Sequence, residues 1–246
     1  MKGLLVQFNL LFTKRIVIYL GVIGVLTVLY AWLTSEVMST SAYQRFFMTQ
    51  LQERYYQDMI TYLKLMVTVS VIFLLMHAQV SNQYDVLFVG RQDTTVFITT
   101  KLIVIMVLLA IVIIIIGSIL TAFGLLTEYF DFTVNLLYIF ISIFILGVYY
   151  LLLGALIYCY MQHILAFMIP LMGYLLAFTM TDPIIESNDL TPLYYWLHFV
   201  FPDMLVNSQY KPYYVYGYGA ILLLCLSFFM FINSRYTYQV VTHKKH

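Results

Sequence analysis

Apolar residues gather in long runs along this chain, and short polar, charged or proline-bearing segments separate them. The pattern predicts six spans, at 16–33, 59–80, 102–126, 136–159, 164–181 and 215–232. An α-helix rises about 1.5 Å per residue, so runs of this length can cross about 30 Å of hydrocarbon. A membrane β-barrel would instead show short segments of alternating polarity. We therefore expect an all-α polytopic membrane protein with six transmembrane helices and a single transmembrane domain over residues 1–246.

Two segments outside the spans have apolar patterns of their own. Residues 1–15 place apolar side chains at helical spacing between basic flanks, which predicts an amphipathic helix in the membrane interface. The alternative is that this segment extends the first span. Residues 182–214 contain four prolines and the aromatic run 193–201, which is too short to cross. We expect re-entrant or interfacial helices there, on the outer side between spans five and six.

Composition agrees with this fold class and narrows the chemistry. Hydrophobic residues make up 63% of the chain and charged residues 9%, whereas soluble domains carry about 25% charged residues. The two cysteines, Cys159 and Cys225, lie in apolar runs and lack the spacing of metal ligands. The basic residues are scattered and form no stripe, so nucleic-acid binding is not predicted. The composition thus favours a membrane protein that binds no metal and no nucleic acid.

Basic residues predict the orientation. With both termini in the cytoplasm of a bacterial cell, the inner side holds eight Lys and Arg residues and the outer side four. An excess of Lys and Arg marks the cytoplasmic side of a membrane protein. The inner set is Lys2, Lys14, Arg15, Arg91, Lys101, Arg235, Lys244 and Lys245; the outer set is Arg45, Arg54, Lys64 and Lys211.

Ionisable residues are scarce within the predicted spans. Spans three to six carry none, and Lys64 is expected near the outer end of span two, where its long side chain can reach the interface. His77 is interpreted as an interfacial histidine at the inner end of that span. A membrane enzyme is disfavoured, because no phosphate-binding loop or zinc-protease or serine-hydrolase motif is present. A membrane enzyme would need a polar cluster at one depth; His198, Asp203 and Tyr210 could gather on the outer face, but their spacing is nonspecific.

Glycines recur two helical turns apart in spans three and four. Gly117 and Gly124 form one such stripe, and Gly147 and Gly154 form another. Small residues allow close packing of helices in lipid. We interpret both stripes as helix-packing surfaces rather than as the lining of a pathway.

The loop between spans two and three, residues 81–100, predicts a short amphipathic helix. Asp85 favours its first turn, Gly90 can end it, Arg91 suits its C-terminal dipole, and Asp93 can cap the next helix. From the residues alone, the segment is either an ordinary capped loop or a docking site for a cytosolic partner.

This loop resembles the coupling helix of the ABC-2 type permease family. The resemblance covers the six-span outline, the N-terminal amphipathic helix, the outer segment with "FVFPDML" and the loop "YDVLFVGRQDTTVFITTK". Many family members open this loop with a Glu-Arg pair, where this chain has Asn82 and Gln83. The resemblance implies an ATPase-docking role for the loop residues Tyr84, Asp85, Leu87, Phe88, Gly90, Arg91 and Asp93.

The resemblance also implies partners. Two permease subunits, alike or different, would stand over two cytosolic ABC ATPase subunits that bind ATP and Mg, so this chain itself would hold no cofactor. Spans rich in Phe, Tyr, Met and Ile suit an amphipathic peptide cargo of the toxin or antimicrobial type. The competing hypothesis is a non-transporting membrane scaffold or sensor that binds a ligand through its outer segment.

Overall fold

The computed structural model describes residues 11–39, 48–80, 94–127, 135–161 and 164–169, with single positions at 9, 171, 172 and 175. Its elements are α2 (Lys14–Ser39), α3 (Met48–Val80), α5 (Thr94–Leu126), α6 (Asn135–Met161) and the short 3-10 helix η2 (Ile164–Met168). Every element in these ranges is helical. The all-α fold class is therefore confirmed for this part of the chain.

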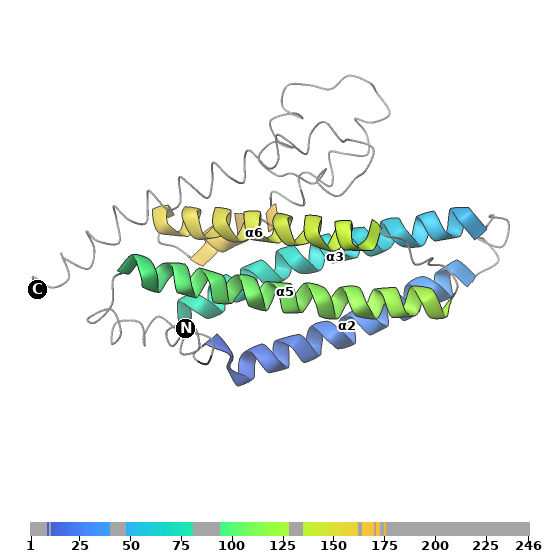
Figure 1. The fold of residues 1–246 in the computed structure, drawn as a ribbon, viewed down its shortest axis with the longest axis horizontal. Helices are drawn as coiled ribbons and strands as arrows, with labels where there is room; N and C mark the ends of the chain where they lie inside the picture. Colours follow the sequence, from blue (N-terminus) through green and yellow to red (C-terminus); the bar gives the residue numbers. More distant parts are fainter. Residues whose placement is uncertain are drawn as a thin grey trace, which may run out of the picture.

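Figure 1 shows the four long helices side by side in an elongated bundle. Successive helices run in opposite directions, so α2 and α5 point one way and α3 and α6 the other. The end of α3 and the beginnings of α2 and α5 consequently share one end of the bundle. We call this the His77 end, after the buried histidine in the last turns of α3.

Three helical stretches are long and apolar enough to cross a membrane: Lys14–Ser39, Arg54–Ala78 and Thr100–Leu126. The apolar stretch Ile139–Ala155 of α6 is shorter. These helices fit a membrane-embedded helical protein. Span six and the re-entrant segment 182–214 lie outside the described residues. The predicted interfacial helix 1–15 and span five are described only in part, so the count of six spans stays a prediction.

Helix α3 begins at Met48, well before the predicted start of its span at residue 59. The added turns are polar and carry an ion pair between Arg54 Nε and Asp58 Oδ2 at 3.5 Å, one helical turn apart. The polar and aromatic composition of segment 34–59 predicts a partly helical loop, and α3 confirms helix there from Met48 onward. Hydropathy alone detects only the apolar run that follows. The midpoint of α3 therefore falls earlier in the sequence than the midpoint of the predicted span 59–80.

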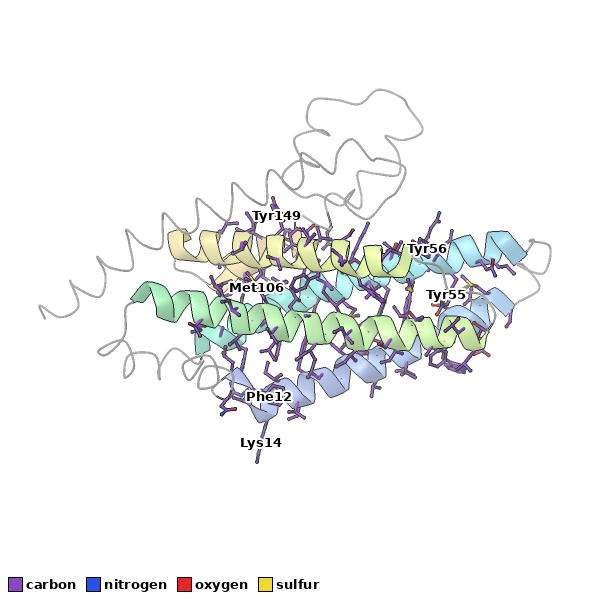
Figure 2. The ribbon with its side chains drawn as sticks, viewed as in Figure 1. Phe12, Lys14, Tyr55, Tyr56, Met106 and Tyr149 are labelled. Carbon is purple, nitrogen blue, oxygen red and sulfur yellow. The ribbon has the colours of Figure 1, made fainter. Side chains whose placement is uncertain are left out.

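Helix α5 lies at the centre of the bundle, with close approaches to α2, α3 and α6. Side chains fill the space between these helices, whereas Lys14 points away from the bundle (Figure 2). Helix α2 lies at the side and leaves one long apolar face uncovered, with Val17, Ile18, Val25 and Leu33 exposed. Such a face would be unfavourable in water and is natural against lipid.

Candidate functional site: the polar seam between α2 and α3

The predicted docking residues, from Tyr84 to Asp93, lie outside the described residues. The structure instead fixes the two points between which their segment runs. Helix α3 ends at Val80 and α5 begins at Thr94, and both points are at the His77 end. The predicted docking segment therefore joins two helices of the bundle at this end.

The predicted packing glycines lie where neighbouring helices meet. A Cβ on Gly147 would lie 2.8 Å from both Leu109 Cδ2 of α5 and Val67 Cγ1 of α3. A Cβ on Gly117 would collide with the ring of Phe140 from α6. Because these two glycines have no side chain, large side chains from neighbouring helices occupy the space beside them. Gly124 and Gly154 are also buried.

A different set of residues joins α2 to α3. Sequence reasoning did not single these residues out as a group. Four polar contacts follow one another along the two antiparallel helices, and two stacked pairs of aromatic rings lie among them. We call this set the α2–α3 seam. It consists of Leu11, Thr13, Tyr19, Thr27 and Tyr30 on one side, and Asp58, Tyr62, Ser70, Phe73 and His77 on the other.

The first contact of the seam is at the His77 end. His77 Nε2 lies 3.0 Å from the carbonyl oxygen of Leu11 and 3.3 Å from Thr13 Oγ1. The Thr13 carbonyl also accepts the first backbone hydrogen bonds of α2, from Ile16 and Val17. His77 is only 9% exposed, so it lies within the bundle as a tie between the N-terminal segment and α3. The sequence had suggested an interfacial histidine without this partner.

The second contact combines a hydrogen bond with a ring stack. Tyr19 Oη donates to Ser70 Oγ at 2.9 Å, and the Tyr19 ring stacks on Phe73 with centroids 3.8 Å apart. Ser70 Oγ in turn donates to the carbonyl of Met66, one turn back in its own helix, at 2.6 Å. Both hydroxyl protons are therefore used.

The third and fourth contacts repeat this arrangement further along. Tyr62 Oη donates to Thr27 Oγ1 at 3.3 Å, and Thr27 donates to the carbonyl of Ile23 at 2.7 Å. The rings of Tyr30 and Tyr62 stack at 3.9 Å, and Tyr30 Oη donates to the carbonyl of Asp58 at 3.1 Å. The seam thus carries hydroxyls and aromatic faces over most of the length of α2.

One regularity in the sequence could have indicated the seam. Tyr19 and Tyr30 are eleven residues apart, as are Tyr62 and Phe73. Eleven residues is about three helical turns, so each pair lies on one helix face.

Lys64 is more buried than its prediction implies. It was expected near the outer end of its span, but it is only 9% exposed and lies close to mid-height of the bundle. Along α3 it falls between Tyr62, which contacts Thr27 near the middle of α2, and Val67, which lies beside Gly147 near the middle of α6. The cause is the early start of α3. A cation at this depth costs about 2.5–3.5 kcal/mol on insertion scales, which marks Lys64 as a functional candidate.

Among the residues that the structure describes, no group of three or more His, Cys, Asp or Glu side chains could hold a metal ion. The seam contains hydroxyl groups, aromatic rings and one histidine, and in this structure they contact one another or backbone carbonyls.

No protein-family model, curated protein or solved structure matches this chain. The resemblance to ABC-2 permeases therefore depends on the sequence pattern described above.

Proposed function

We propose that this chain is the membrane-spanning permease subunit of an ABC exporter that acts with a separate cytosolic ATPase and a second permease subunit, alike or different. The observation that supports it is the resemblance of residues 84–101 to a coupling helix. That segment leads from the end of α3 to the first turns of α5, the central helix of the bundle.

The packing indicates how movement of the ATPase would be transmitted to the helices of such a subunit. α3 and α5 pack closely on each other, and Leu109 and Val67 meet at Gly147 of α6. A push on the segment between Val80 and Thr94 would move α3 and α5 as one rigid unit. The ATPase can shift the bundle between two states only if it binds those states with different affinity.

The proposed cargo class is argued from the side chains of the α2–α3 seam. Tyrosine hydroxyls and aromatic rings meet between α2 and α3, and the charged side chain described near mid-height is Lys64. We propose an amphipathic peptide of the toxin or antimicrobial type as cargo, because it carries both an apolar and a polar face.

Substitution in the docking segment tests the proposal. Leu87→Asp or Phe88→Asp, each made in the full chain co-expressed with its ATPase, should weaken capture of the ATPase at least about tenfold, equivalent to about 1.4 kcal/mol. The reason is that a carboxylate in an apolar contact must be desolvated without a partner. The measurement is a pull-down from solubilised membranes, with membrane insertion checked in parallel.

Leu126→Asp is the matched control. Leu126 is 81% exposed and ends α5 at the opposite end of the bundle, so the same substitution there should leave capture unchanged. Retained capture by both docking variants would contradict the proposal. Full function without any ATPase would instead support the scaffold or sensor hypothesis.

A further inference from the structure

We propose that the α2–α3 seam is the cargo-binding site: an amphipathic helical peptide inserts between α2 and α3, and its polar groups replace the contacts that the two helices make with each other. This inference rests on the proposed function and adds to it the place where the cargo binds.

The first argument is how the helices are joined. α2 approaches α5 closely, and α3 approaches both α5 and α6 closely, whereas α2 and α3 meet mainly through side chains. Two stacked ring pairs, Tyr19 with Phe73 and Tyr30 with Tyr62, act as spacers between the backbones. The seam can therefore open without separating any pair of closely packed helices, provided that α2 turns about its contact with α5.

The second argument is what each hydroxyl does once the seam is open. Ser70 and Thr27 donate to carbonyls of their own helices, Met66 and Ile23, and these bonds do not depend on the partner helix. Tyr19, Tyr30 and Tyr62 donate across the seam, so opening frees their three hydroxyl protons. An incoming peptide that offers hydroxyl, amide or carbonyl acceptors can take these donors, which leaves no buried donor unsatisfied.

The third argument is contrast with the other interfaces. Between α5 and its neighbours, apolar side chains fill glycine holes, as Leu109 and Val67 do at Gly147. The polar contacts described there are fewer: Tyr55 Oη donates to the Leu120 carbonyl of α5 at 2.7 Å, and the buried hydroxyl of Ser142 in α6 has no hydrogen-bond partner among the described residues. The seam is the interface where described polar contacts recur along most of the helix length.

The fourth argument is room for α2 to move. Its outward face is apolar and exposed, and a Cβ on Gly21 or Gly24 would meet nothing within 4 Å. Displacement of α2 away from α3 therefore meets no described side chain at these two positions.

A reversible bridge across the seam provides the test. In a background without Cys159 and Cys225, Tyr19→Cys and Ser70→Cys are joined by a short, reducible bifunctional thiol reagent. The permease–ATPase complex is then placed in lipid vesicles with a synthetic amphipathic helical peptide. Because both substitutions change seam residues, each rate is compared with that of the same double-cysteine protein before bridging. We expect ATP-driven peptide transport to fall at least tenfold below that rate when the bridge is closed and to return to it when the bridge is reduced, with ATPase capture intact.

The control bridge joins Val67→Cys to Leu109→Cys, which lie on helices that the proposal keeps packed together. It should leave transport within twofold of the unbridged protein. Transport at the unbridged rate with the seam closed would overturn the binding site while leaving the proposed function in place. Absence of ATP-driven transport in the unbridged protein would overturn the proposed function and this inference with it.

A second measurement separates binding from structure. Tyr19→Phe combined with Tyr62→Phe keeps the rings and removes two of the three hydroxyl donors that cross the seam, so the KM for peptide should rise about threefold to tenfold with kcat little changed. Tyr55→Phe, which removes an interhelical donor outside the seam, should leave KM unchanged. An equal effect of the two changes on KM would contradict a seam that binds the peptide.

Discussion

At the scale of one residue, the burial of Lys64 changes how its charge is interpreted. The side chain is only 9% exposed and lies near mid-height of the bundle, between Tyr62 and Val67 along α3. A charge within a membrane-spanning helix costs insertion free energy, whereas a methionine of similar length does not. Under the proposed function, we expect this lysine to act in cargo movement.

Replacement of this lysine gives the residue-scale prediction. Lys64→Met should insert at least as well as the original chain, because the cost of about 2.5–3.5 kcal/mol for a central charge is removed. Peptide export by the assembled transporter should fall at least tenfold. The two readouts are the amount of folded protein in membranes and the rate of ATP-driven transport. Normal export by the methionine variant would contradict a functional role for Lys64.

At the scale of the helix, the sequence predicts a helix end correctly where the helix and the apolar run end at the same residue. Helix α5 ends at Leu126, the predicted end of its span, and α6 begins within a residue of its predicted start. The start of α3 was not predictable from hydropathy, since its first turns are polar and continue the helix through local pairs such as Arg54 with Asp58.

Glycine packing gives the prediction at this scale. Gly147→Ala places a Cβ 2.8 Å from Leu109 Cδ2 and Val67 Cγ1, so it should lower the free energy of unfolding by about 1–3 kcal/mol through overpacking. Gly21→Ala is the matched control, because a Cβ there would meet nothing within 4 Å. Replacing glycine by alanine within a helix also lowers the conformational entropy lost on folding. The measurement is the thermal unfolding midpoint in one detergent. Equal midpoints for the two variants would contradict the packing of α6 against α3 and α5.

The seam shows which part of the candidate site sequence patterns cannot supply. Each contact joins residues from two helices, as Tyr19 does with Ser70 and Thr27 with Tyr62. Spacing within one helix can place Tyr19 and Tyr30 on a common face, but it cannot determine which helix covers that face. That choice depends on packing, which brings α2 beside α5 and leaves its hydroxyl-bearing side toward α3.

At the scale of the whole molecule, the bundle is an antiparallel set of apolar helices with one end defined by His77, Val80 and Thr94. The proposed role requires that this end face the cytosol, because a cytosolic ATPase can reach the segment 81–93 only from that side. The excess of Lys and Arg predicts this orientation. Because α5 spans the bundle, its two ends should report opposite sides of the membrane.

Thiol labelling of intact cells tests this orientation directly. In a background without Cys159 and Cys225, a membrane-impermeant maleimide should label Thr127→Cys, which follows the far end of α5, and should label Gln92→Cys only after the membrane is permeabilised. Labelling of Gln92→Cys from outside intact cells would place the docking segment on the wrong side for an ATPase and would contradict the proposed function.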